Sequence, residues 1–150
     1  MDNKFNITII GAGIVGLAIA EELSKFYSNI LVIEKEDTFG QHVSSRNSEV
    51  IHSGFYYPPN SLKSKLCVEG NERMYSFAKK YHINHNKCGK LIVANRKTDY
   101  LKLENIMKNA LECGLNDISI LNKSEAQKKE PRVNCLKALW IPSTGIIDSH

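Results

Sequence analysis

Three glycines near the amino terminus have a spacing that suits the binding of a diphosphate group. The segment GAGIVG at residues 11–16 matches the pattern G-x-G-x-x-G. In this pattern the first glycine permits a tight turn, the second lets the backbone approach a pyrophosphate, and the third lets a helix pack closely on a strand. The amide groups that begin the helix would then face the anion, helped by the helix dipole. The spacing therefore predicts dinucleotide binding, with a glycine set that serves only packing as the alternative.

Glu34 lies 18 residues beyond Gly16, near the distance expected for an acid that binds a ribose. Its carboxylate would accept hydrogen bonds from the ribose hydroxyls. An acid at this position favours an unphosphorylated ribose and so argues against NADP. The pattern is compatible with either FAD or NAD. If the glycines serve only packing, Glu34 is an incidental surface residue.

A strand, a helix and a second strand are needed to hold these groups. Residues 5–10 form a short apolar run typical of a buried strand. Residues 14–27 carry apolar side chains at helical spacing, and Asn29 ends that helix. Residues 30–33 form a second strand of the buried type, closed by Glu34. This order predicts the first βαβ unit of a parallel sheet.

The rest of the chain alternates between predicted helices and strands. Helices are expected at residues 61–81, 99–113 and 124–129, and strands at 90–94, 118–121 and 137–141. In the first of these helices Ser61 is the predicted N-cap. Its core candidates are Leu62, Leu66, Met74, Phe77 and Ala78. Residues 145–150 are interpreted as the approach to a further helix, with Asp148 or Ser149 as its N-cap.

The segment between residues 37 and 60 has no sustained periodicity and is rich in Gly, Ser, Asn and Pro. A loop of this length inside a compact domain is usually functional or disordered. Its second half, NSEVIHSGFYYPP at residues 47–59, contains a single histidine, His52.

Several motifs stand in a fixed order along the chain: NSEVIHSGFYYPPNSLKSKLCVEGN, CGKLIVA, KKEP and PSTGIID. Together with the glycine turn, they resemble the D-amino-acid-oxidase-like FAD-dependent oxidoreductases, in particular the L-2-hydroxyglutarate oxidase or dehydrogenase branch. The resemblance runs from Ile7 to Asp148. It implies FAD as the cofactor, and oxidation of L-2-hydroxyglutarate, a 2-hydroxy acid, to the 2-oxo acid by hydride transfer to the flavin.

The fold that the resemblance implies is α/β. A Rossmann-like FAD-binding βαβ domain at residues 1–85 would be joined to part of an α+β substrate domain at residues 86–150. Members of the family are considerably longer than this chain. We therefore expect an amino-terminal portion that is completed by a missing carboxy-terminal part or by a partner chain, with weak FAD affinity and no turnover by itself.

The resemblance also implies a set of cofactor-binding residues. The pyrophosphate would be held by Gly11, Gly13, Ile14, Val15 and Gly16, and the adenosine ribose by Glu34 with Lys35 beside it. Donors to the phosphates and the ribityl chain would be Ser44, Ser45, Arg46, Asn47 and Ser48. Arg46 suits an anion because its fork can bind two oxygens, although a solvated loop side chain is equally compatible. Glu49 departs from the family pattern, in which a small residue, usually glycine, is expected.

His52 is the candidate catalytic residue. A neutral imidazole near pH 7 could take the hydroxyl proton of the substrate. Contact with the flavin alone, or a purely structural hydrogen bond, are the alternatives. Tyr56 and Tyr57 could line the substrate pocket or only pack, and Lys90 and Trp140 are interpreted as fold residues.

Other functions stay open. An amine or amino-acid oxidoreductase and a glycerol-phosphate oxidoreductase would use the same scaffold, because a fold does not determine a substrate. An inactive nucleotide-binding fragment, or half of a split protein, is a non-enzymatic alternative.

Composition narrows the possible partners. The net charge of +4 comes from dispersed lysines, so no nucleic-acid partner is expected. The four cysteines and five histidines show no metal-ligand spacing, and no metal site is expected. The apolar run after Ile7 is too short to span a bilayer. We expect a cytoplasmic protein, with a peripheral position at the inner membrane as the alternative.

Overall fold

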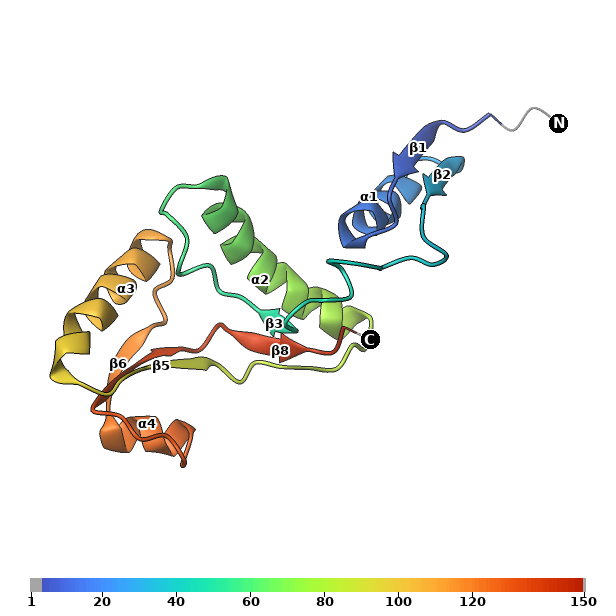
Figure 1. Cartoon of the computed structure of the whole chain (residues 1–150). Coiled ribbons are helices and arrows are strands. Elements are labelled where there is room, and N and C mark those ends of the chain that lie inside the picture. Colours follow the sequence, from blue (N-terminus) through green and yellow to red (C-terminus); the bar gives the residue numbers. More distant parts are fainter. Residues whose placement is uncertain (1–3, 150) are drawn as a thin grey trace. The chain divides into compact units, whose positions relative to one another are not determined.

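The computed structural model describes residues 4–149, which form two compact units. Unit 1 extends to Ser48, and unit 2 begins at Glu49. Both are drawn in Figure 1, and each is described here by itself.

Unit 1 is built on a parallel pair of strands joined by a helix. Strand β1 (Ile7–Ile10) pairs with β2 (Ile30–Ile33), with Ile7 opposite Ile30 and Ile10 opposite Ile33. Helix α1 (Ile14–Ser24) forms the crossover that a parallel pair requires. The predicted βαβ unit is confirmed, with a strand that begins two residues later and a helix that ends three residues earlier than expected.

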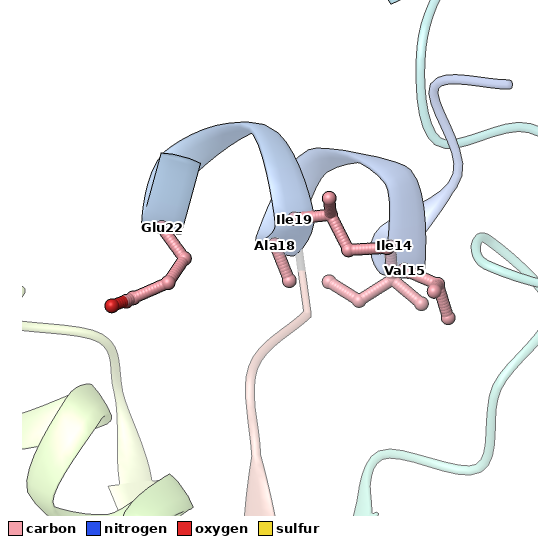
Figure 2. Close-up of a pocket in the computed structure, with 5 residues that line it drawn as sticks. All are labelled: Ile14, Val15, Ala18, Ile19 and Glu22. Atoms are coloured by element: carbon pink, nitrogen blue, oxygen red, sulfur yellow. The ribbon is translucent and has the colours of Figure 1, made fainter. Parts of the chain in front are cut away.

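Much of the apolar surface of unit 1 is exposed. Ile9 and Ala12 are buried, whereas the side chain of Ile10 is 87% exposed. Figure 2 shows one side of α1, where a shallow hollow of about 370 Å³ is lined by Ile14, Val15, Ala18, Ile19 and Glu22. The apolar periodicity thus predicted the helix correctly, but this face of it is not buried.

Unit 2 contains two three-stranded antiparallel sheets. The first has the strand order β5-β7-β6, and the second has the order β3-β8-β4. The strands are β3 (Val50–Ile51), β4 (His85–Asn86), β5 (Lys90–Ala94), β6 (Ser119–Asn122), β7 (Lys137–Ile141) and β8 (Gly145–Ile147). The helices are α2 (Leu62–Lys80), the 3-10 turn η1 (Lys97–Asp99), α3 (Tyr100–Glu112) and α4 (Lys123–Lys129).

The main core of unit 2 lies between α3 and the sheet β5-β7-β6. Successive side chains of a strand point to opposite faces. Leu139 and Ile141 of β7 therefore pack in one buried cluster with Leu103 and Ala110 of α3. Ala138 faces the other way and packs with Ala126 of α4. Figure 1 shows the two helices on either side of this sheet.

Two helix caps explain where α2 and α4 begin. Ser61 accepts a hydrogen bond from the amide of Ser64 at 3.1 Å, which confirms the predicted N-cap. Asn122 and Glu125 form a capping box at the start of α4. Because of this box, α4 begins at Lys123, one residue before the predicted start at residue 124.

The predicted core of α2 is mostly wrong. Ala78 is buried, but the other four candidates are exposed: Leu62, Leu66, Met74 and Phe77. The remaining buried residues of the helix are the polar Ser64 and Asn71. Asn71 and Tyr75 of α2 donate hydrogen bonds to the carbonyls of residues 52 and 143. The buried side of α2 is therefore the side that carries these polar residues, and its apolar stripe is exposed.

Strand β8 at residues 145–147 was not predicted. It does not test the predicted N-cap at Asp148 or Ser149, which stays a prediction. Strand β8 takes the centre of its sheet because β3 and β4 pair on its two sides. The predicted boundary between the FAD-binding domain (residues 1–85) and the substrate domain (residues 86–150) is a boundary of function. The packing boundary after Ser48 does not test it, and it stays a prediction.

Gly89 offers a direct test of the packing in unit 2. Its φ is +74°, and a Cβ there would lie 2.0 Å from the Trp140 ring. Gly89→Ala should lower the free energy of unfolding by about 2 kcal/mol or more. The measurement is urea unfolding followed by the fluorescence of Trp140, the single tryptophan.

Gly70→Ala is the matched control. It lies within α2, and a Cβ there meets nothing within 4 Å. It should raise the free energy of unfolding by roughly 0.5–1 kcal/mol, because alanine favours a helix over glycine. Equal effects of the two substitutions would contradict the described packing.

Candidate cofactor and active site

The amino end of α1 has the geometry that the glycine pattern predicts. Gly13 is the N-cap, with extended backbone angles φ −75° and ψ 177°. A Cβ on Gly16 would lie 2.0 Å from the carbonyl oxygen of Gly11, so no side chain fits between helix and turn. The first amides of a helix lack intrahelical acceptors. One of them, that of Ile14, donates to Ser44 Oγ at 2.9 Å.

Glu34 is tied into the same turn. Its Oε2 accepts from the amide of Ala12 at 2.7 Å, and its Oε1 accepts from the amides of Lys35 at 2.8 Å and Glu36 at 3.1 Å. These bonds, that from Ala12 first, hold the pKa of Glu34 below its usual range, so the group is ionised at neutral pH. A carboxylate offers about four acceptor positions. One therefore stays available for a ribose hydroxyl.

Lys35 and His42 both point to Glu36 rather than to Glu34. Lys35 Nζ lies 3.3 Å from Glu36 Oε1, and His42 Nε2 lies 2.8 Å from the same oxygen. The hydrogen bond from His42, followed by that from Lys35, lowers the pKa of Glu36. The structure therefore places Lys35 beside the predicted ribose acid but pairs it with the next carboxylate.

The predicted donors at residues 44–48 differ in how they are used. Ser45 Oγ donates to the carbonyl of His42 at 3.1 Å, and Asn47 Nδ2 donates to the carbonyl of Ser44 at 3.0 Å. These bonds shape the loop itself. Arg46 is exposed and forms no ion pair with residues 4–149, so its guanidinium group is available to an anion.

Glu49 occupies a backbone conformation that favours glycine, since its φ is +54°. Its Oε1 accepts from the amide of Ser149 at 3.2 Å and from the hydroxyl of Ser149 at 2.9 Å. A positive φ is one that glycine adopts at little cost, and the acidic side chain is bound within unit 2.

The His52 loop in unit 2 is held from two sides. Ser53 Oγ lies 2.5 Å from Thr144 Oγ1, and both residues are buried. Asn71 Nδ2 donates to the carbonyl of His52 at 3.1 Å and to that of Ser143 at 2.9 Å. The backbone of His52 is therefore fixed, although the residue is exposed.

The electrostatics of His52 favour a neutral ring. Partial burial of the imidazole is the main cause that lowers its pKa, and the positive charge of Lys90 adds to it. A neutral imidazole near pH 7 can accept a proton, which is what a general base requires.

The neighbouring tyrosines differ from each other. Tyr56 is exposed, with its ring centroid 4.0 Å from that of Phe55. The Tyr57 carbonyl accepts from Asn109 Nδ2 at 3.0 Å, and its ring lies 4.4 Å from Lys63 Nζ. Tyr57 is thus tied to α2 and α3, whereas Tyr56 is exposed; a substrate-pocket role for either residue stays a prediction.

Sequence reasoning missed the residues that support this loop. Asn71 and Thr144 were assigned no role, and Lys90 was interpreted as a fold residue. The available signal was a polar residue in the middle of a predicted amphipathic helix, at Asn71. The contact of Thr144 with Ser53 spans 91 residues, and no local pattern announces it.

Residues 4–149 contain neither a metal-ligand cluster nor a membrane-spanning helix. No group of three or more His, Cys, Asp or Glu side chains is arranged to hold a metal ion. No helix in this part of the chain has the length and apolarity to cross a membrane. The predicted cytoplasmic location stays a prediction.

Comparison with known proteins decides the family. Residues 6–150 match the family described as DAO, FAD dependent oxidoreductase. The chain belongs to this family of FAD-dependent oxidoreductases. Among its relatives, the mitochondrial L-2-hydroxyglutarate dehydrogenase of Arabidopsis thaliana is 44% identical over 147 residues, covering 98% of this chain and 30% of the relative. The human protein of the same name is 39% identical over 148 residues, covering 97% and 32%. The chain thus spans about a third of the length of these relatives.

Solved structures with a similar fold agree. L-alpha-glycerophosphate oxidase from Mycoplasma pneumoniae with FAD bound has a TM-score of 0.83 and 30% identity, over 95% of this chain and 38% of the other. Glycine oxidase from Geobacillus kaustophilus has a TM-score of 0.80 at 22% identity, over 97% and 41%. The predicted α/β fold with a Rossmann-like βαβ unit is confirmed.

The hydrogen bond between Glu34 and Ala12 generates a prediction for acid solution. A carboxylate whose folded pKa is depressed contributes stability above its unfolded pKa, and that stability is lost as the pH falls through the folded pKa. Residues 4–48 should therefore lose stability below about pH 4.3, the ordinary glutamate pKa. The amide proton shift of Ala12, followed by NMR, should titrate with an apparent pKa below that value.

Glu34→Gln should abolish the titration of the Ala12 amide. Glu21→Gln removes the same charge from an exposed position of α1 and should leave the titration of the Ala12 amide unchanged. An Ala12 amide that titrates equally in both variants would rule out the bond.

Proposed function

We propose that the protein is the amino-terminal portion of an FAD-dependent enzyme that oxidises L-2-hydroxyglutarate to the 2-oxo acid. The observation that carries the proposal is its similarity to enzymes named L-2-hydroxyglutarate dehydrogenase, at 39–44% identity over nearly the whole chain. The geometry of the glycine turn and of the His52 loop supports it.

The residues of unit 1 fit the phosphates and ribose of FAD. The Ile14 amide is satisfied by an oxygen, Ser44 Oγ, which indicates that this helix end accommodates an oxygen acceptor such as a phosphate. The ionised Glu34 suits a ribose hydroxyl, and the exposed Arg46 suits a phosphate. The residues that would hold FAD are Gly11, Gly13, Ile14, Val15, Gly16, Glu34, Lys35, Ser44, Ser45, Arg46, Asn47 and Ser48.

His52 would take the proton from the substrate hydroxyl. When bound, FAD supplies the acceptor for the hydride that leaves C2 of the hydroxy acid. The imidazole is suited to the proton transfer because partial burial and Lys90 keep it neutral. The bonds from Asn71 and Thr144 hold the backbone on which it is carried.

The rest of the enzyme would be supplied by further polypeptide, on the same chain or on a partner. The chain covers 30–35% of its curated relatives. The exposed apolar side chains on α1 and α2 provide surface for that part to bury.

A glycerol phosphate is the second candidate substrate. The L-alpha-glycerophosphate oxidase, at 30% identity, is the observation that favours it. Both substrates carry a hydroxyl that loses a proton, so His52 would have the same role.

A chimera tests the proposal. Residues 1–150 would replace the matched segment of the Arabidopsis thaliana relative. We expect the purified chimera to carry FAD, and L-2-hydroxyglutarate to bleach the flavin absorbance without oxygen faster than glycerol 3-phosphate or glycine does. The 150-residue chain by itself should bind FAD weakly and show no turnover. A colourless, soluble chimera would refute FAD binding, and faster bleaching by glycerol 3-phosphate would establish the second candidate.

The role of His52 has its own test in the chimera. His52→Ala should retain FAD and slow flavin reduction by about 10²–10⁴-fold, as expected for loss of a general base. With His52 present, the reduction rate should fall as the pH drops below its pKa, which lies under the ordinary value of about 6.5. His82→Asn is the control, because His82 is exposed and its φ of +57° suits asparagine. A His52→Ala variant with unchanged reduction would exclude the base, and loss of FAD would assign His52 to cofactor contact.

A further inference from the structure

Two hydrogen bonds join the neighbour of His52 to the neighbour of Lys90, a residue that neither the sequence motifs nor the comparisons connect with catalysis. Ser53, next to His52, bonds through its hydroxyl to Thr144 Oγ1 at 2.5 Å. The carbonyl of Thr144 accepts from the amide of Gly89 at 2.8 Å, and Gly89 precedes Lys90. His52 and Lys90 are distant in sequence. Each is the sequence neighbour of a residue at one end of this pair of hydrogen bonds, Ser53 or Gly89.

The start of β5 is rigid at this point. Lys90 opens the strand and pairs with Ile141 in the register of β5 and β7. Gly89 before it has the Trp140 ring against its α-carbon, where a Cβ would not fit. The base of the Lys90 side chain is thus set by the sheet and not by a flexible loop.

The charge of Lys90 is left uncompensated. The residue is half-buried, and within residues 4–149 its ammonium group forms neither a hydrogen bond nor an ion pair. Its positive charge opposes protonation of the His52 ring. An anionic ligand beside His52 would provide the counter-ion that this ammonium group lacks within residues 4–149.

We infer that Lys90 binds a carboxylate of the substrate, so that His52 and Lys90 form one site for a hydroxy acid. This inference rests on the proposed function and deepens it. Lys90 would anchor the acid while His52 takes the hydroxyl proton. The same positive charge serves both steps, because it attracts the carboxylate and disfavours the protonated ring that could not act as a base.

The FAD-free 150-residue chain tests the inference without turnover. The probe is glutarate, a dicarboxylate without a hydroxyl group, and the signal is the ring proton shift of His52 during a pH titration. Glutarate should raise the pKa of His52 in the wild type and in Lys90→Arg, which keeps the charge. Lys90→Gln should raise that pKa in the absence of glutarate and weaken the glutarate effect at least about tenfold in concentration.

Lys87→Gln is the matched control. It removes an equal charge three residues away, from a lysine whose Nζ lies 5.2 Å from the Tyr75 ring. It should behave as the wild type does. A His52 shift that responds equally to glutarate in Lys87→Gln and Lys90→Gln would overturn the inference.

The chimera provides the second readout. Lys90→Gln should raise KM for L-2-hydroxyglutarate by about 10- to 100-fold with FAD content unchanged, and Lys90→Arg should recover part of the loss. A wild-type KM in a chimera that binds FAD and turns over would overturn the inference and leave the proposed function standing. A chimera without FAD, together with a Lys90-dependent glutarate effect in the 150-residue chain, would overturn the proposed function and support the carboxylate site.

Discussion

The arrangement of unit 2 depends on one short segment, residues 143–145, and on the hydrogen bonds that it makes. The Ser143 carbonyl accepts from Asn71 and Tyr75 of α2, and the Thr144 hydroxyl bonds to Ser53. The Thr144 carbonyl accepts from the amide of Gly89. Because buried polar groups are costly to leave unpaired, this segment holds α2, the His52 loop and the start of β5 in one arrangement.

Unit 1 uses a single carboxylate in a comparable way. Glu34 receives three backbone amides, and the one from Ala12 ties the second strand to the glycine turn. The bonds keep the group ionised, which is the state that a ribose hydroxyl needs as an acceptor. Glu34, which is proposed to bind the ribose of the nucleotide, therefore also shapes the glycine turn.

The sequence predicted those elements whose signals are local. The strands at residues 30–33, 90–94 and 137–141 were predicted with the observed bounds, and Ser61 was predicted as a cap. Burial was predicted less well, because periodicity identifies an apolar stripe but not what covers it. Strands β3, β4 and β8 have two or three residues each and exist only because they pair with one another.

The amino-acid sequence by itself determined the βαβ unit, the glycine turn and the family, and it predicted Glu34 as the ribose acid. These follow from spacing within about 30 consecutive residues, or from ordered motifs. Only the tertiary structure decided how His52 is held and that the charge of Lys90 acts on its ring. The bonds responsible connect residues as far apart as Ser53 and Thr144, and the charge on Lys90 acts through space. Neither the hydrogen bonds nor the charge effect produces a periodic pattern in the sequence, because both depend on where distant backbone segments meet.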